Sequence, residues 1–286
     1  LIDIDNRFAI QFTIAPTFGK NTGYVEEIKI LHNNSDGDEG NYKQWGTVFK
    51  RNDVEEGDLF LSDVAASDHI QEHFDFLSVY HFQGASERSR IKIPSRINDN
   101  RVLRGDGANL AAFLYFLQEK HGKEFENIER HISEVAPFFD RFDLAPDRLN
   151  SENIELRWVE KGSSDYFNAF DISDGTLRFI ALTALLLQPS LPKVIVIDEP
   201  ELGLHPFAIN KLAAMIKNAA VNGCQVIIST QSAGLLDNFE PEDIVTVDRD
   251  EEQSTFRRLK SEELDEWLED YTIGDLWNKN VIGARP

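Results

Sequence analysis

Two adjacent carboxylates follow an aliphatic run in the second half of the sequence. The run is Val194–Ile197, and Asp198 and Glu199 come directly after it. Because a buried strand can present acids only at its end, we expect both carboxylates in the crevice beyond the carboxyl edge of a sheet. Asp198 would there hold Mg²⁺, mostly through water, and Glu199 would orient or deprotonate a water that attacks a γ-phosphate. A strand that ends in a solvated acidic turn is the alternative.

A second polar segment, Asp171–Arg178, stands upstream of this run. Within it, Ser173 is a good N-cap for the apolar helix that follows, and Gly175 lets a ligand approach the backbone closely. A helix N-terminus with free amides and a hydroxyl is an anion site. The segment therefore predicts a phosphate site, and a helix that is only capped is the alternative.

In this order, the two segments resemble the second half of an ABC-type ATPase head, in the RecF/SMC-like branch of the AAA-family ATPases. Ile172–Thr176 stands at the signature position, and Asp198 and Glu199 stand as the Walker B acids. The resemblance runs from about residue 171 to residue 248 and extends to the tail at 276–283. It implies ATP and Mg²⁺ as cofactors, with Asp198 as a metal ligand and Glu199 as a catalytic residue.

The resemblance also implies roles for residues of the signature, the D-loop and the switch. The signature residues, which cap nucleotide held by the other subunit of a dimer, are Ser173, Gly175, Thr176 and Arg178. The D-loop residues are Gly203, Leu204 and His205. Gln231 stands at the switch position as a catalytic residue. Gln83 is either a lobe-linking glutamine that senses Mg²⁺ or an ordinary polar residue of a loop.

Two residues depart from the family pattern. Asp174 takes the place of the second signature glycine, which puts a carboxylate near the expected phosphate. We expect Asp174 to point away or to be neutralised by Arg178. Gln231 takes the place of the switch histidine, and its amide can hydrogen-bond a γ-phosphate but carries no positive charge. Slow turnover, or a regulatory rather than a motor role, would follow.

No phosphate loop of the form Gly-x-x-x-x-Gly-Lys-Ser/Thr occurs in the 286 residues. The nearest string, Ile14–Asn21, lacks the first glycine and the final hydroxyl. In this family the loop precedes the antiparallel strands, whereas this chain starts at Leu1 and its one methionine is Met215. We therefore expect the N-terminal part of a parent protein to be missing. This chain alone would bind ATP weakly and be inactive, while the parent would hydrolyse ATP and form a homodimer around it.

The period of the apolar residues predicts the elements that hold these groups. Alternation over Arg7–Ile14 and Val25–Leu31 predicts antiparallel strands. Helical spacing over Leu110–Leu117 and Phe125–Val135 predicts two helices, and Ile154–Val159 alternates as a strand. Farther on, helices alternate with apolar strands, which predicts a parallel sheet buried on both faces. The elements predicted there are helices over 175–187 and 207–221 and strands over 194–197, 225–229 and 244–247.

These elements predict an α/β fold in the form of an ABC-type ATPase head. Its P-loop NTPase-like parallel sheet lobe would be accompanied by an antiparallel β lobe and a helical insertion. We place the antiparallel β lobe at 1–83 and the helical insertion at 84–150. The parallel lobe with the signature, Walker B and switch covers 151–248, and an acidic helical tail covers 249–286.

Composition narrows the classes of partner. The formal net charge is −21, so bulk electrostatics repels nucleic acid, although a local basic patch can still bind DNA. The single cysteine, Cys224, excludes a disulfide framework, fits the cytoplasm and is expected as a small core residue. The apolar stretches fall well short of the ~20 residues of a membrane helix, so we expect no membrane partner. DNA or a protein stays open as a partner, since relatives act in DNA repair, chromosome maintenance and phage defence.

Other interpretations stay open beside the ATPase. A nucleotide-gated clamp or regulatory partner protein with little turnover is the main one, favoured by Asp174 and Gln231. A metal-dependent nuclease is a minor one, because too few residues follow the acidic cluster Asp248–Glu252 to form a nuclease fold. His69 and His73 lack a third ligand near them in sequence. One basic string, which fits a phosphate contact or a solvated loop, consists of Arg88, Arg90, Lys92, Arg96, Arg101 and Arg104.

Overall fold

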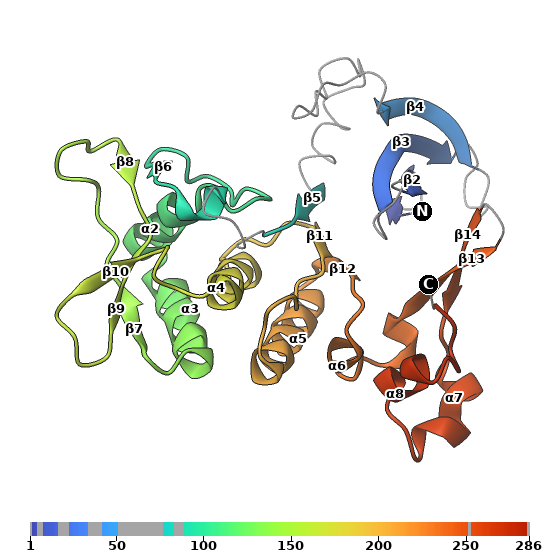
Figure 1. Cartoon of the computed structure of the whole chain (residues 1–286). Coiled ribbons are helices and arrows are strands. Elements are labelled where there is room, and N and C mark those ends of the chain that lie inside the picture. The colour runs from blue at the N-terminus through green and yellow to red at the C-terminus, as the bar shows by residue number, and fades with distance from the viewer. Residues whose placement is uncertain are drawn as a thin grey trace. The chain divides into compact units, whose positions relative to one another are not determined.

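The computed structural model describes four strands between residues 2 and 50, and then residues 77–82, 89–250 and 253–284. The chain divides into two compact units, Leu1–His73 and Phe74–Pro286 (Figure 1). Each unit is described by itself. Gln83, Arg88, His69 and His73 lie outside the described residues.

The first unit holds an antiparallel sheet with the strand order β1-β2-β3-β4. Its strands are β1 (Ile2–Ile4), β2 (Phe8–Pro16), β3 (Gly23–Asn33) and β4 (Tyr42–Lys50). The two alternating stretches of sequence fall on β2 and β3, so the predicted antiparallel strands are confirmed. Alternation identifies them because successive side chains of a strand point to opposite faces of the sheet.

The second unit is built around a parallel sheet with the order β12-β11-β5. Its strands are β5 (Leu77–Tyr80), β11 (Val194–Asp198) and β12 (Gln225–Ser229). The aliphatic run therefore forms the central strand, and its carboxyl end lies at the same edge as the ends of both neighbours. The predicted α/β fold with a parallel sheet is confirmed.

The two faces of this sheet differ in burial. Ile195 and Ile197 are buried in a core that also contains the buried apolar residues of α4 (Asp174–Leu186) and α5 (Pro206–Val221), the two helices labelled in Figure 1. On the other face Val196 is half-buried, and its partner on β5, Val79, is 58% exposed. The prediction of burial on both faces is wrong, because α4 and α5 pack against one face and the described residues leave the other half-open.

The segment between β5 and α4 contains the two predicted helices, α2 (Leu110–Lys120) and α3 (Gly122–Val135). It also contains a sheet formed by β7 (Phe139–Phe142), β9 (Arg157–Glu160) and β10 (Tyr166–Asn168), and a pair formed by β6 (Ser95–Arg96) and β8 (Asn153–Ile154). The single strand predicted over 154–159 is wrong. The chain crosses from one sheet to the other at Glu155 and Leu156, so β8 and β9 have different partners.

The C-terminal part contains a hairpin of β13 (Val245–Asp250) and β14 (Gln253–Arg258), followed by α7 (Ser261–Leu268) and α8 (Ile273–Asn278). The short helices η3 (Arg90–Lys92), α6 (Ala233–Leu236) and η4 (Pro241–Asp243) complete the second unit. The tail has a small core of its own, formed by Ile244, Leu259, Leu264, Ile273, Leu276 and Ile282. In the part of the chain that the structure describes, no helix combines the length and apolar character that a membrane span needs.

Candidate functional site

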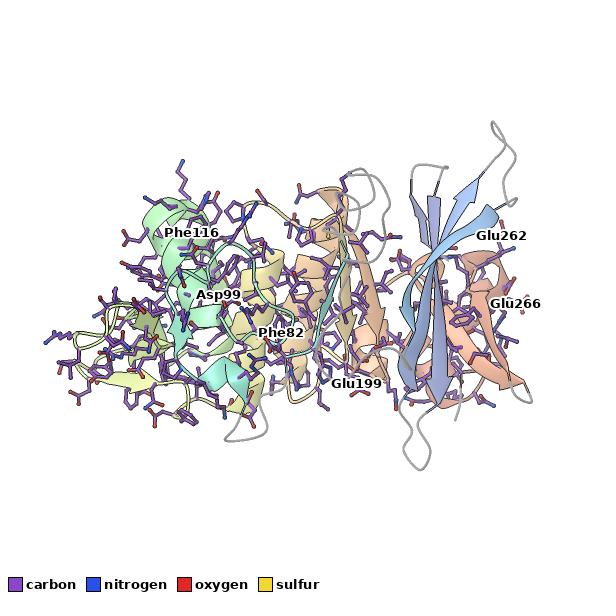
Figure 2. The ribbon with its side chains drawn as sticks, turned by 90° about the horizontal axis from the view of Figure 1, so that it is seen from above. Phe82, Asp99, Phe116, Glu199, Glu262 and Glu266 are labelled. Carbon is purple, nitrogen blue, oxygen red and sulfur yellow. The ribbon has the colours of Figure 1, made fainter. Side chains whose placement is uncertain are left out.

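The predicted Walker B acids lie at the carboxyl end of the central strand, where Figure 2 labels Glu199. Asp198 pairs in register with Ser229 of β12, and the Ser229 hydroxyl donates a hydrogen bond to the Asp198 carboxylate. From the end of β5, His81 Nδ1 lies 3.5 Å from Asp198 Oδ2. Even so, the Asp198 side chain is 55% exposed. The three ends of the parallel strands thus converge on one open carboxylate.

Sequence analysis missed His81 and Ser229 as neighbours of Asp198. Each stands at the end of a strand that pairs with β11, and that position was the available signal. It could be used only once the strand order was known, because the parallel partners of β11 are separated from it by many residues. The local sequence around either residue has no motif of its own.

Glu199 has an unusual backbone conformation. Its φ is +43°, in the left-handed region that residues other than glycine rarely adopt. The Glu199 amide donates to the Ser229 carbonyl at 2.9 Å, which continues the sheet ladder one residue past the strand. Strained residues of this kind gather at functional sites, where the surrounding structure holds them in place.

A third acid, Glu201, is half-buried close to the two strand-end acids. Its Oε1 accepts a hydrogen bond from Thr230 Oγ1 at 2.6 Å, while its Oε2 is buried without a partner among the described residues. Burial raises the pKa of Glu201, and the Thr230 hydrogen bond opposes that rise. Because Thr230 directly precedes Gln231, Glu201 ties the D-loop side of the site to the switch. Sequence analysis missed this residue.

The switch residue Gln231 is exposed at the same edge of the sheet. The hydroxyl of the preceding residue, Thr230, bonds Glu201, and the amide of the next residue, Ser232, donates to Thr230 Oγ1 at 3.0 Å. Ser232 then caps α6 by accepting from the Leu235 amide. The backbone on both sides of Gln231 is therefore fixed, and its side-chain amide faces solvent.

The signature segment forms the start of α4, as predicted. Ser173 Oγ accepts the Thr176 amide at 3.2 Å and lies 2.8 Å from Thr176 Oγ1, so Ser173 is the N-cap. Gly175 packs against the D-loop, because a Cβ at this position would lie 2.2 Å from the carbonyl oxygen of Gly203. Gly203 itself has a φ of +80°. Packing within this chain therefore explains why glycine stands at both positions. The ligand approach predicted for Gly175 is a separate reason for glycine there.

Asp174 is neutralised by a residue that sequence analysis did not assign to the site. Its Oδ1 lies 2.7 Å from Nζ of Lys92, whose side chain is only 11% exposed. The expected ion pair with Arg178 is therefore wrong. The sequence could not predict this pairing, since Lys92 lies 82 positions away in η3.

Arg178 bonds two backbone carbonyls instead of a carboxylate. Its Nε donates to the Phe82 carbonyl at 2.8 Å, and its Nη1 donates to the Leu202 carbonyl. Burial lowers the pKa of Arg178, opposed by the charges of Asp174, Glu201 and Glu199. Arg178 thus joins α4 to the D-loop and to the segment after β5.

The remaining D-loop residues position α5. Leu204 is half-buried against the core, and His205 caps α5 by accepting the Phe207 amide on its Nδ1 at 3.2 Å. The side chains of this loop therefore serve packing and capping within the chain.

Two weaker candidates have structural explanations. Cys224 is a buried free thiol whose pKa is raised by burial, as expected of a small core residue. In the acidic cluster, Asp248 Oδ1 accepts the Ala284 amide at 2.6 Å and so holds the C-terminal turn.

The parallel sheet, the acids at its carboxyl edge and the capped helix have the arrangement that the resemblance to an ABC-type ATPase head implies. A family model described as "AAA domain, putative AbiEii toxin, Type IV TA system" (AAA_21) matches residues 20–237, which is more than half of the chain. The chain therefore belongs to this family.

Curated relatives match shorter segments. The energy-coupling factor transporter ATP-binding protein EcfA2 of Streptococcus agalactiae serotype Ia is 27% identical over 126 residues, covering 41% of this chain and 44% of that protein. The Old nuclease of Escherichia phage P2 is 40% identical over 73 residues, covering 26% of this chain and 12% of that protein. This chain thus spans less than half the length of these relatives.

Among solved structures, an SMC head bound to the C-terminal winged-helix domain of ScpA has a TM-score of 0.47 and 14% identity, covering 91% of this chain and 76% of that one. An SMC head from a study of ATP-driven dimerisation and DNA-stimulated activation of SMC ATPases has a TM-score of 0.39 and 21% identity, covering 55% and 94%.

Proposed function

We propose that the edge of the β12-β11-β5 sheet is an ATP-hydrolysis site that works with Mg²⁺. The observation that carries the proposal is the convergence of Asp198, Glu199 and Gln231 at the carboxyl ends of neighbouring parallel strands. This is where open α/β sheets bind ligands. Membership of an ATPase family supports the assignment.

The residues present fit a hard divalent cation. Asp198 offers an exposed carboxylate beside a hydroxyl of Ser229, and oxygen ligands with room for several waters are what Mg²⁺ requires. Bound there, Mg²⁺ would neutralise charge on the phosphates. Glu199 accepts a proton from the attacking water as that water bonds to the γ-phosphorus and ADP leaves. Gln231 donates a neutral hydrogen bond to the γ-phosphate, which stabilises less charge than a protonated histidine.

This sequence by itself supplies no motif to cradle the β- and γ-phosphates. We therefore propose that the isolated 286-residue chain binds ATP weakly and turns it over little. The half-open face of the parallel sheet, with Val79 58% exposed, is compatible with further elements packing there.

The signature end of α4 acts on nucleotide held by a second copy of the protein. Ser173 and Thr176 present hydroxyls at the helix N-terminus, where amides and the helix dipole favour an anion. Lys92 neutralises Asp174, which lowers the repulsion between that carboxylate and a phosphate. ATP would thereby join two copies as a homodimer, and hydrolysis would release them. DNA or a protein would be the target, in repair or phage defence in the cytoplasm.

The test compares ATP turnover by the protein as its gene encodes it with turnover by the 286-residue chain, each with and without duplex DNA. We expect turnover by the gene-encoded protein and little by the isolated chain, and stimulation by DNA would support a role in repair. Absence of turnover and of ATP binding in the gene-encoded protein would overturn the proposal.

A nucleotide-gated clamp is the second candidate, and the neutral Gln231 favours it. Replacing Glu199 with Gln in the gene-encoded protein separates the two. Loss of cellular activity with ATP binding intact supports turnover as the function. Retained cellular activity with turnover abolished supports the clamp.

A further inference from the structure

Three arginines of the basic string, Arg90, Arg96 and Arg104, line one cleft. They lie far in sequence from the strand-end acids Asp198 and Glu199. The cleft has a volume of about 510 Å³, and we define this arginine cleft by Arg90, Ser95, Arg96, Asp99 and Arg104, which line it. A volume of this size suits a small molecule, since ligand pockets run from roughly 300 to 1,000 Å³. The string was predicted to contact phosphate or to be a solvated loop, and three of its members, Arg90, Lys92 and Arg104, form ion pairs with carboxylates.

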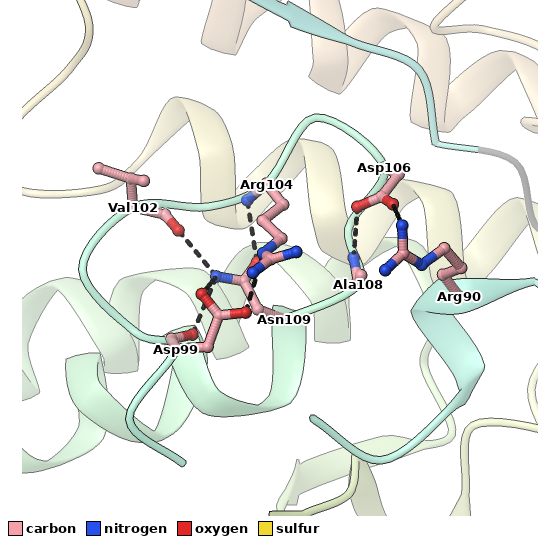
Figure 3. Close-up of polar contacts among 7 residues, drawn as sticks. All are labelled: Arg90, Asp99, Val102, Arg104, Asp106, Ala108 and Asn109. Atoms are coloured by element: carbon pink, nitrogen blue, oxygen red, sulfur yellow. Dashed lines mark hydrogen bonds and ion pairs between the residues drawn. The ribbon is translucent and has the colours of Figure 1, made fainter. Parts of the chain in front are cut away.

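Two of the arginines are held in place by acids (Figure 3). Arg104 Nε lies 2.8 Å from Asp99 Oδ2, and Arg90 Nη1 lies 3.1 Å from Asp106 Oδ2. Each pair leaves further N–H groups of the guanidinium unused, because a guanidinium has five such donors in a fixed fork. Both arginine side chains are at least half exposed, so those donors can reach a ligand.

The loop that carries these groups is rigidly built around one buried side chain, that of Asn109. Its Nδ2 donates to the carbonyls of Asp99 at 2.9 Å and Val102 at 2.8 Å, and its Oδ1 accepts the Arg104 amide at 2.9 Å (Figure 3). Asn109 is fully buried. The backbone positions of Asp99 and Arg104 are therefore fixed before any ligand arrives, which lowers the ordering cost of binding.

Two further residues have unused hydrogen-bonding capacity. Arg96 is exposed and pairs with no carboxylate in the described part of the chain. Ser95 is 8% exposed, and its Oγ has no hydrogen-bond partner among the residues that the structure describes. A buried hydroxyl without a partner is uncommon and calls for a ligand or water to satisfy it. An anion in the cleft would accept from the guanidinium forks that line it.

We propose that the arginine cleft binds the phosphate group of a small phosphorylated compound. Arginine forks match phosphate oxygens bidentately, and three arginines outnumber the two aspartates that orient them. A small compound is favoured over nucleic acid because the chain carries a net charge of −21, which repels a long polyanion wherever it extends beyond the cleft. The proposal is independent of ATP hydrolysis at the sheet edge.

The cleft also adjoins the signature helix through one short element. Arg90 and Lys92 both belong to η3, and Lys92 pairs with Asp174 in the first turn of α4. A ligand bound by Arg90 would therefore contact η3, the same short helix whose Lys92 neutralises Asp174.

The experiment titrates the 286-residue chain with inorganic phosphate and with phenyl phosphate by calorimetry, and compares Arg96→Ala with the wild type. Arg96 is chosen because its removal leaves no acid without its partner. We expect saturable binding that Arg96→Ala weakens by about tenfold or more. Arg96→Lys, which keeps the charge but loses the fork, should fall between the two.

The matched control is Arg130→Ala, since Arg130 is an exposed arginine on α3 whose side chain bonds Asn127 of the same helix. This variant should bind phosphate as the wild type does. Phosphate held at the sheet edge would be insensitive to Arg96, so equal binding by the wild type and Arg96→Ala would overturn the proposal. No saturable binding of either probe would overturn it too. Binding of an oligonucleotide through Arg96, without binding of the small probes, would replace it with a nucleic-acid site.

Discussion

The sheet edge and the Asn109 loop of the arginine cleft are held by contacts of different range in the sequence. At the sheet edge, Arg178 bonds a carbonyl 96 positions away, and Thr230 bonds Glu201 29 positions away. In the arginine cleft, Asn109 bonds groups no more than 10 positions away. The first site therefore forms only when distant segments of the second unit meet. In the second, the loop from Asp99 to Asn109 closes on itself, while Ser95 and Arg96 are held by pairing with β8. Changes at the sheet edge should disturb contacts between distant segments, and changes at Asn109 should loosen its own loop first.

Asn109→Ala should have the largest effect on stability. It removes three donated hydrogen bonds, one of them long at 3.4 Å, and one accepted bond from a fully buried side chain. Several bonds of this kind, each of roughly 1 kcal/mol, predict a fall of about 3 kcal/mol in the free energy of unfolding. Urea denaturation measures the fall. Asn150→Ala is the control, because Asn150 is exposed and its loss should cost under about 0.5 kcal/mol. Hydrogen exchange that quickens across the whole second unit, rather than in the loop first, would break the comparison.

Arg178→Ala should come next. The variant loses two charge-assisted bonds to the carbonyls of Phe82 and Leu202. We expect the free energy of unfolding to fall by about 2 kcal/mol. Arg178→Lys is the control, because it keeps one charged donor and should lose less. Phosphate affinity of the arginine cleft should stay unchanged in Arg178→Ala, and its loss would show that the two sites are not separately built.

Gly175→Ala tests the contact between the signature and the D-loop. The new Cβ would lie 2.2 Å from the Gly203 carbonyl oxygen, so the backbone must shift. Overpacking of this kind predicts a loss of about 1–2 kcal/mol in thermal or urea unfolding. Gly122→Ala is the matched control, since nothing lies within 4 Å of a Cβ there and alanine is the better helix former. Equal stability of the two variants would contradict the close packing.

Substitution of Glu201 should have the smallest effect, a change in how the free energy of unfolding depends on pH. Burial raises its pKa above 4.5, so the folded chain holds this proton more tightly than the unfolded chain. Its contribution to stability is present below pH 4.5 and is lost as pH rises through the raised pKa. Glu201→Gln keeps an oxygen that can accept the Thr230 hydrogen bond, but its side chain no longer ionises. The wild type should therefore lose stability relative to the variant as pH rises toward neutrality. A constant difference would show that Glu201 is not perturbed.

The difference between local contacts and contacts of distant segments also explains what the sequence could predict. The strand-end position of Asp198 and Glu199, the Ser173 cap and the parallel sheet follow from local patterns, and the structure confirms them. The pairing of Lys92 with Asp174 and the contact of His81 with Asp198 depend on which distant segments meet. No period or motif encodes that choice. The nucleotide roles of the signature, D-loop and switch residues stay predictions.

The roles of the two strand-end acids can be separated in a single pair of variants. In the protein as its gene encodes it, ATP binding at varied Mg²⁺ and single-turnover hydrolysis would be measured for Asp198→Asn and Glu199→Gln. We predict that Asp198→Asn weakens the Mg²⁺ dependence of ATP binding. Glu199→Gln should bind ATP as the wild type does and hydrolyse it about 100-fold or more slowly. Unchanged hydrolysis in both variants would contradict an ATPase site at this edge of the sheet.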